Sequence, residues 1–427
     1  GLSTGSLPSL RDLSIYFGPF MEGIQGAGSR QLGEVLSTRT FPSLRNVSLC
    51  WSPNQTFGAL CEGLSQGSVA SPVLLNIALS QIWSYDIAWH ARRADRAMVP
   101  FADAIRAGKL TGLQAVEFGS PMLLSSAQVG GEVFGGALTH ADARLTSLEE
   151  VELSGSQKGL AEVFDSMSRG PGLLPALRKL HCCSRSPLGV NGTRYLSEIV
   201  SVGKVPSLKD LCLNVSGCGQ EGMAAFAAAL SSPRISALRQ LDVTFGAASD
   251  GPAGSHALAA ELGLFSQALG GGHLRRLEEL QVHGLVAIEE VRALCVGLGG
   301  GSLTSLRLLD LCDIPLGSEG GRALSEVVIA EKLPELRILK LTSTSLTDEG
   351  LTALKEAWLT VSRLPSLLQR LRMNRNMLTS AVEDTLSALF ASPRMTALYQ
   401  VDLGGNDQIG NSSRSSLCDK FPDITYF

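Results

Sequence analysis

The chain has 427 residues, of which 44% are hydrophobic and 18% are charged, and its formal net charge is −4. This composition is typical of a folded globular protein. It excludes a mainly disordered chain and a protein that binds nucleic acid through a strong basic field. No apolar run approaches the ~18 residues that a membrane-spanning helix needs, so we expect no membrane insertion.

A short hydrophobic frame, Leu-x-x-Leu-x-Leu or a close apolar variant, recurs along the chain at intervals of about 30 residues. Residues 306–311, 336–341 and 398–403 are clear copies. A fixed period of this length predicts a stacked solenoid of about 13 units, because no unit can bury its own apolar side. The first Leu of each copy is found at Leu10, Leu44, Leu74, Leu113, Leu148, Leu177, Leu208, Leu238, Leu277, Leu306, Leu336, Leu368 and Leu398.

Each unit is predicted to contain one strand and one helix. Alternation within the frame places Leu339 and Leu341 toward the core and Lys340 away from it. The residues after the frame have helical spacing, as in 346–358, where the hydroxyl of Thr347 is suited to cap the start of a helix.

This periodicity resembles the leucine-rich repeat family, and the length of the helical part resembles its ribonuclease-inhibitor-like subclass. Residues 316–320 and 346–350 are similar to the helix-entry signature of that subclass. The resemblance implies an α/β horseshoe of about 13 strand–helix repeats, with a parallel concave sheet and convex helices. The family usually places Asn three positions after the last frame Leu, where only Asn376 and Asn406 match. Hydroxyls such as Ser156 and Thr344 are expected to do part of this work elsewhere.

The repeats set the predicted domain organisation. Residues 1–410 are predicted to form the leucine-rich repeat domain, and residues 411–427, which lose the frame, a C-terminal cap or docking tail. The first frame starts almost at once and has no polar cap before it, so we expect more protein upstream.

Nine cysteines, an odd number with irregular spacing, favour a reducing compartment and therefore an intracellular, cytoplasmic protein. Asn-x-Ser/Thr triplets would suit a secreted protein, but such triplets are common by chance.

The chain contains no nucleotide-binding loop, no His-Glu-x-x-His and no Cys-x-x-Cys, so no enzyme activity and no cofactor are predicted. One arrangement offers a remote alternative. Glu152, His181, Cys212 and Asp242 occupy equivalent outward positions on four consecutive strands, which would suit a thiol or metal site. An open sheet face has no evident oxyanion hole and no lid, so an ordinary polar surface is favoured.

Charges and aromatic residues segregate along the predicted outward face. Strand positions are acidic in the middle repeats and basic toward the carboxyl end, and aromatic residues follow the first strands. Such a gradient can fix the register of a protein partner and speed encounter, although solvated faces carry charges in any case. The predicted protein-binding residues of this face are Tyr16, Phe17, Trp51, Glu117, Glu150, Glu152, Asp210, Asp242, Glu279, Asp310, Lys340, Arg370, Arg372 and Arg375.

The long third unit supplies a second candidate surface, which is rich in aromatic and basic residues. Core packing of the insertion explains its apolar stripe, and a docking patch is the alternative. Its arginines do not make a nucleic-acid site without a broader basic field. The candidate residues are Trp83, Tyr85, Trp89, Arg92 and Arg93.

For function, the sequence predicts a non-enzymatic protein–protein interaction module. It would be a scaffold subunit or recognition arm of a hetero-complex or larger polypeptide, with one or more protein partners and no nucleic acid. The alternative, which the resemblance implies, is a regulator of a partner enzyme, such as a GTPase activator or an inhibitor. An activator must deliver a polar residue from the sheet edge. The arginines that recur after the first frame Leu, more simply explained as solvated flanks, are Arg45, Arg178, Arg239, Arg307 and Arg337.

Overall fold

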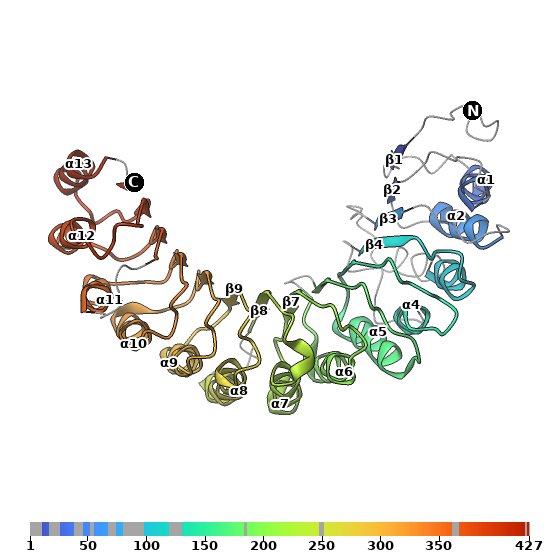
Figure 1. The fold of residues 1–427 in the computed structure, drawn as a ribbon, viewed down its shortest axis with the longest axis horizontal. Coiled ribbons are helices and arrows are strands. Elements are labelled where there is room, and N and C mark those ends of the chain that lie inside the picture. The colour runs from blue at the N-terminus through green and yellow to red at the C-terminus, as the bar shows by residue number, and fades with distance from the viewer. Residues whose placement is uncertain are drawn as a thin grey trace. The chain divides into compact units, whose positions relative to one another are not determined.

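In the computed structural model, the frames form short parallel strands and the segments between them form helices (Figure 1). Packing divides the chain into unit one (Gly1–Asn214) and unit two (Val215–Phe427). The structure describes residues 11–16, 26–37, 46–51, 55–66, 74–79, 98–118, 130–182, 186–246, 252–360, 367–422 and 425–426.

Unit one alternates strands and helices, and residues 98–106 are also helical. Its strands are β1 (Asp12–Tyr16), β2 (Asn46–Trp51), β3 (Leu74–Leu79), β4 (Leu113–Phe118), β5 (Glu150–Leu153), β6 (Lys179–Cys182) and β7 (Asp210–Asn214). Its helices are α1 (Gly26–Ser37), α2 (Gln55–Gln66), α4 (Gly130–Leu138), α5 (Gln157–Arg169) and α6 (Gly189–Val202).

Unit two continues the alternation and includes the 3-10 turn η2 (Pro233–Ile235). Its strands are β8 (Gln240–Thr244), β9 (Glu279–His283), β10 (Leu308–Asp310), β11 (Ile338–Lys340), β12 (Arg370–Arg372), β13 (Gln400–Asp402) and β14 (Thr425–Tyr426). Its helices are α7 (Gly219–Leu230), α8 (Pro252–Gly270), α9 (Ile288–Leu298), α10 (Gly317–Ile329), α11 (Asp348–Thr360), α12 (Val382–Phe390) and α13 (Asn411–Lys420).

Within each unit, neighbouring strands pair in parallel and in chain order. In unit two, equivalent frame positions lie opposite one another, as Leu309 lies opposite Leu339 and Leu339 opposite Leu371. Between β2 and β3 the frames are offset, because Leu49 rather than Val47 lies opposite Ile77. Equivalent frame positions are therefore not opposite each other in this pair of strands, and the pairing of β3 with β4 also shifts between Leu75 and Asn76.

The first strands extend beyond their frames, which corrects the predicted position of two aromatic residues. Tyr16 and Trp51 are the last residues of β1 and β2, instead of following these strands. The extra pairing of Tyr16 with Cys50, and of Trp51 with Leu79, accounts for the longer strands.

The frame residues form the core between the strands and the helices. Leu339 and Leu341 are fully buried, whereas Lys340 between them is partly exposed, as the alternation predicts. Burying each such side chain stabilises the fold by about 1.5–3 kcal/mol. Aromatic rings add to the core of unit one, where Phe118 and Phe134 lie 4.9 Å apart between centroids.

Asn376 and Asn406 satisfy the backbone of consecutive turns. The Oδ1 atom of Asn376 accepts hydrogen bonds from the N–H groups of Thr344 and Leu346, both at 2.9 Å. Its Nδ2 group donates to the carbonyls of Leu341 and Met373. Asn406 repeats the pattern one unit later, because its Oδ1 accepts from the N–H of Asn376. The predicted asparagine position is confirmed at both residues.

The hydroxyl residues predicted to replace Asn behave differently from one another. Thr344 donates from Oγ1 to the carbonyl of Leu341 at 3.0 Å, so it does part of the predicted work. Ser156 instead caps α5, because its Oγ accepts from the N–H of Gly159 at 3.1 Å. Thr347 caps the start of α11 in the same way, as predicted.

The turns of unit two share one unusual backbone conformation. The residue two positions after the last frame residue has a positive φ, between 56° and 79°, in Gly284, Asp313, Ser343 and Arg375. Gly405 repeats this conformation with a φ of 73°. Only glycine adopts such a conformation without steric cost.

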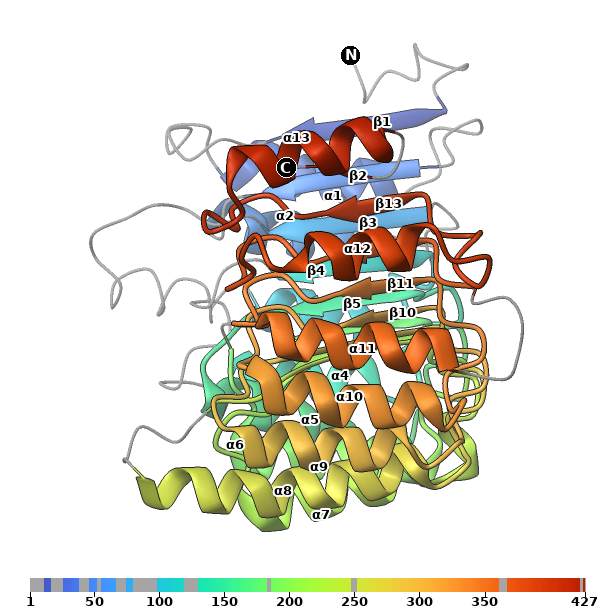
Figure 2. The ribbon, with the colours of Figure 1, turned by 90° about the vertical axis from the view of Figure 1, so that its left-hand side faces the viewer.

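The helices of unit two are stacked side by side (Figure 2). Helices α10 and α11 approach closely because glycines face each other, and a Cβ atom on Gly321 would lie 2.6 Å from the Cα of Gly350. Among the described residues, no helix is both long enough and apolar enough to cross a membrane.

The last residues of the chain continue the pattern of helix and strand. In α13, Leu417 is fully buried, and the ring of Phe421 lies 5.1 Å from that of Phe390. Strand β14 pairs in parallel with β13. Each unit is therefore an α/β leucine-rich repeat solenoid with a parallel open sheet, and the predicted fold class is confirmed.

Candidate functional site

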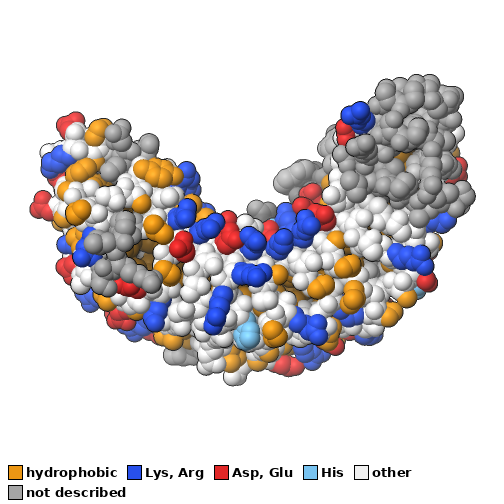
Figure 3. All heavy atoms as spheres, in the orientation of Figure 1, with side chains coloured by type: hydrophobic (Ala, Val, Ile, Leu, Met, Phe, Trp, Pro, Cys, Tyr) orange, Lys and Arg blue, Asp and Glu red, His pale blue; other side chains and the backbone are white. Residues whose placement is uncertain are grey.

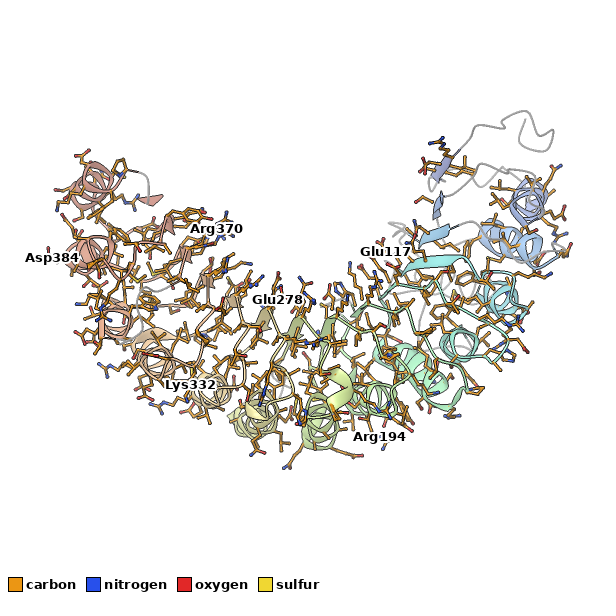
Figure 4. All side chains as sticks on the ribbon, viewed as in Figure 1. Glu117, Arg194, Glu278, Lys332, Arg370 and Asp384 are labelled. Carbon is orange, nitrogen blue, oxygen red and sulfur yellow. The ribbon has the colours of Figure 1, made fainter. Side chains whose placement is uncertain are left out.

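The face of each sheet that points away from the helices, called here the strand face, carries most of the predicted site residues. Figure 4 shows Glu117 on the strand side of unit one, with Arg194 on its helix side. In unit two the same figure shows Glu278 and Arg370 on the strand side and Asp384 on the helix side.

In unit one, the strand register brings four outward residues into one row. Glu117 lies opposite Glu152, Glu152 opposite His181, and His181 opposite Cys212. Three members of the row predicted from the sequence, Glu152, His181 and Cys212, are therefore neighbours on the sheet. Asp242, its fourth predicted member, belongs to unit two.

The imidazole of His181 lies next to an acid on the neighbouring strand. Its Nε2 lies 2.9 Å from Oδ1 of Asp210. This arrangement differs from a His–Cys pair, in which the imidazole would take the thiol proton. The described residues contain no group of three or more His, Cys, Asp or Glu side chains placed to hold a metal ion.

The two glutamates of this row repel each other. Burial and the nearby Glu152 carboxylate raise the pKa of Glu117, and the Lys179 ammonium opposes them. Lys179 also lies 3.9 Å from the carboxylate of Glu150, another predicted site residue. The acidic surface predicted for these repeats is present.

In unit two, a second row carries both signs of charge. Six outward residues follow one another across neighbouring strands, and Figure 3 shows basic and acidic side chains interleaved along the strand side. The row consists of Asp242, Gln281, Asp310, Lys340, Arg372 and Asp402. Glu279 lies on the same face, and His283 lies 3.8 Å from Asp242.

Asp310 is not the exposed acid that the sequence suggests, because only 5% of its surface is accessible. Its Oδ2 accepts a 2.8 Å hydrogen bond from Nζ of Lys340, and its Oδ1 accepts from the N–H of Cys312. Burial would raise the pKa of Asp310, but the hydrogen bonds from Cys312 and Lys340, with the Lys340 charge, hold it below its usual value. These two predicted contact residues are therefore engaged with each other.

The carboxyl end of the strand face has a different character. Arg370 donates from Nε to the hydroxyl of Tyr399 at 2.7 Å, and its guanidinium lies 5.4 Å from the centre of that ring. Arg372 follows on the same strand, and Arg375 is exposed in the next turn. Among the described residues, no acidic side chain forms an ion pair with any of these three arginines. Arg370, Arg372, Arg375 and Tyr399 are called here the arginine patch.

The flank arginines after the first frame Leu are paired instead. Arg178 lies 3.4 Å from Glu149 in unit one. In unit two, Glu278 lies 2.7 Å from Arg239 and 3.6 Å from Arg307. Arg337 similarly lies 3.9 Å from Glu335, whereas Arg45 lies outside the described residues. Intramolecular pairing thus distinguishes the described flank arginines from the arginine patch.

On the helix side of unit two, a groove of about 590 Å³ lies between α9 and α10. It is lined by apolar residues, including Val296 and Val327, and by charged ones, including Arg292 and Glu319. Arg292 and Glu319 are 2.6 Å apart and neutralise each other.

Several predicted residues cannot be placed by their side chains. Tyr16 and Trp51 lie on described strands, but their side chains are not described, and Phe17 lies outside the described residues. The candidate docking residues of the insertion also lie outside them, namely Trp83, Tyr85, Trp89, Arg92 and Arg93. The surface predicted for this insertion therefore stays a prediction.

Sequence reasoning missed Tyr399 and Asp402. Tyr399 occupies the flank position after the first frame Leu, since its N–H donates to the carbonyl of Gln369 in the same ladder. No other unit carries an aromatic residue at this position, and most carry a charged one, which is the signal that could have identified Tyr399.

The described cysteines are not in disulfides, and most of them are buried. Burial, with the nearby Glu326 carboxylate, raises the pKa of Cys295 to about 12. Burial and contact with Glu261 likewise raise the pKa of Cys218 to about 12. Such thiols behave as small apolar groups and not as nucleophiles at neutral pH.

No family model and no curated protein matches the chain. Among solved structures, an internalin (inlF) from Listeria monocytogenes is 14% identical, covers 94% of each chain and has a TM-score of 0.35. A structural genomics target from Bacteroides fragilis is 12% identical and covers 66% of this chain and 75% of its own, with a TM-score of 0.39. Because both TM-scores are low, the leucine-rich repeat fold rests on the chain's own repeats, strand register and asparagine turns.

Proposed function

We propose that the protein is a non-enzymatic protein-binding module that uses its strand face. The contrast between two classes of arginine carries this proposal. Arg178, Arg239, Arg307 and Arg337 each lie within 4 Å of a glutamate carboxylate, whereas Arg370, Arg372 and Arg375 have no acidic partner among the described residues. Charges that the fold does not compensate are available to a partner.

The architecture supports the same proposal. Repeats stacked in one direction present an extended surface to a partner. Each strand contributes one side chain to each row that crosses this surface. The rows combine acids, bases and a tyrosine, and such mixed surfaces give a partner both register and specificity. We further propose that the repeats are of the ribonuclease-inhibitor-like subclass, since helices such as α10 and α11 span 13 residues each.

A scaffold subunit or recognition arm in an intracellular hetero-complex fits these observations best. Buried cysteines without disulfides suit a reducing compartment. A GTPase activator would need a free polar residue at the sheet edge, and the paired flank arginines do not favour that alternative. In unit one, the pairing of His181 with Asp210 gives no support to a thiol site at Cys212.

The proposal is tested by the native mass of the protein in gently lysed source cells. A protein-binding module is expected to migrate well above its own 45.0 kDa. The double variant Glu279→Arg with Arg372→Glu reverses charges on the strand face and is expected to shift the protein toward the monomer mass. The matched control Arg322→Glu reverses an exposed charge on the helix side and is expected to leave the complex intact.

A wild-type protein that migrates only as a monomer contradicts a stable complex. A complex that survives the strand-face variant but dissociates in the helix-side variant contradicts the assignment of the binding face.

A further inference from the structure

We infer that the arginine patch of unit two binds an acidic segment of a protein partner through carboxylate groups. This inference rests on the proposed function and names the partner chemistry of one part of the strand face. The patch combines Arg370, Arg372, Arg375 and Tyr399 at the carboxyl end of the sheet.

Tyr399 holds Arg370 in an orientation suited to a carboxylate. The Nε of Arg370 is occupied by the tyrosine hydroxyl at 2.7 Å, and the ring lies beside the guanidinium. The two terminal nitrogens have no hydrogen-bond acceptor among the described residues. Two parallel N–H groups on one guanidinium match the two oxygens of a carboxylate. Fixing the side chain beforehand also reduces the entropy lost on binding.

Arg372 supplies a second site at the spacing of an extended strand. It lies two residues after Arg370, so both side chains leave the same face of β12 about 7 Å apart. Its buried Nε has no hydrogen-bond partner in the part of the chain that the structure describes. Asp402 lies opposite Arg372 in the register, but its Oδ1 accepts from the N–H of Gly404 at 3.1 Å. The neighbouring Lys340 is neutralised by Asp310.

The rest of the surface selects a protein over a nucleic acid. Asp242, Glu279, Asp310 and Asp402 share the strand face of unit two with the patch. A uniform row of phosphates would meet these carboxylates, whereas a protein segment can present acids to the patch and other residues to the acidic strands. The net charge of −4 for the whole chain disfavours nucleic acid in the same way.

The test is fluorescence anisotropy of the full chain with a labelled oligo-glutamate peptide, an oligo-glutamine peptide of equal length and an oligothymidylate. Oligo-glutamate is expected to bind and oligo-glutamine is not. Arg370→Gln and Arg372→Gln are each expected to weaken oligo-glutamate binding about tenfold, because each removes a charge-assisted hydrogen-bond pair. Arg370→Lys keeps the charge but lacks the two parallel N–H groups of the guanidinium, so an intermediate loss of oligo-glutamate affinity is expected.

Two further variants sharpen the experiment. Arg292→Gln removes a helix-side arginine of unit two and is expected to change binding by less than about twofold. Asp310→Asn releases Lys340 from its ion pair and is expected to strengthen binding. If a variant on β12 does not fold, as judged by its thermal unfolding, the exposed Arg375→Gln replaces it.

Three outcomes overturn the inference: no binding of oligo-glutamate, equal losses from Arg292→Gln and Arg370→Gln, or tighter binding of oligothymidylate that the same arginines support. The native-mass experiment separates this failure from failure of the proposed function. The complex can persist in Arg370→Gln and still dissociate in the double variant Glu279→Arg with Arg372→Glu. In that case the strand face is still the binding face, and only the inference of an acidic partner fails.

Discussion

Replacing Asn376 by alanine tests the physical account of how consecutive repeats are held in register. The side chain accepts from the N–H groups of Thr344 and Leu346 and donates to the carbonyls of Leu341 and Met373. Alanine removes all four of these hydrogen bonds; the two N–H groups lose their side-chain acceptor, whereas the carbonyls of Leu341 and Met373 keep donors in Thr344 and Asn406. At about 1 kcal/mol for each net hydrogen bond, and with water replacing some of them, we expect a loss of about 3 kcal/mol in the free energy of unfolding.

Urea unfolding monitored by the fluorescence of Trp358 is a suitable assay, because this tryptophan is buried in α11, which follows the turn of Thr344 and Leu346 that Asn376 bonds. Tryptophans outside unit two are replaced by phenylalanine in the background. Hydrogen exchange gives a local readout, since the amides of Thr344 and Leu346 are expected to exchange faster in the variant.

Asn374→Ala is the matched control, two residues away in the same turn. Within the described segments, its side chain accepts only from Oγ1 of Thr342 at 2.6 Å, so a loss of less than about 1 kcal/mol is expected. Equal losses for Asn374→Ala and Asn376→Ala would refute the reasoning. Asn376→Ala and Asn406→Ala should also be non-additive, because the Oδ1 of Asn406 accepts from the backbone of Asn376.

Five further variants test the account. Asp310→Asn is expected to lower stability at neutral pH. Since the folded-state pKa of Asp310 is depressed, its contribution is present above the ordinary carboxyl pKa and disappears as pH falls through the folded value, so urea midpoints should converge in acid. Gly321→Ala should lower the free energy of unfolding by about 1–3 kcal/mol, because its Cβ forces α10 and α11 apart. Gly263→Ala has open space around it and should raise the free energy of unfolding by about 0.5–1 kcal/mol. Equal stabilities of the two variants in calorimetry would contradict the packing. Ser343→Gly removes the cost of a positive φ and should raise the free energy of unfolding by about 0.5–1 kcal/mol, measured by urea unfolding. Leu417→Ala should cost about 2–5 kcal/mol and speed amide exchange in α12 if α13 protects the end of the core, and unchanged exchange there would argue against a cap.

Much of the fold was readable from local sequence, because a buried strand and a helix have different hydrophobic periods. The alternation of Leu339, Lys340 and Leu341 predicts which side chains are buried, and the structure confirms it. Asn376 was expected from the resemblance to the leucine-rich repeat family, and its amide explains the preference because it can both accept from and donate to the backbone of a turn.

The parts that could not be predicted depend on contacts between repeats. The offset of β3 against β2 is invisible in either frame alone and arises from pairing of Leu49 with Ile77. The burial of Asp310 also depends on a neighbour, because a charged residue at an outward position is normally solvated until a partner such as Lys340 meets it. Tyr399 acquires its role only through Arg370, which lies 29 positions before it.

The central claim, that partners bind the strand face of unit two, is tested most directly by site-specific photocrosslinking in source cells. A benzoylphenylalanine residue is placed at Gln281 on the strand face or at Val296, which is 75% exposed on the helix side. The account predicts a discrete crosslinked adduct from Gln281 that excess unlabelled wild-type protein suppresses, and none from Val296. An adduct of this kind from Val296 alone would contradict the claim.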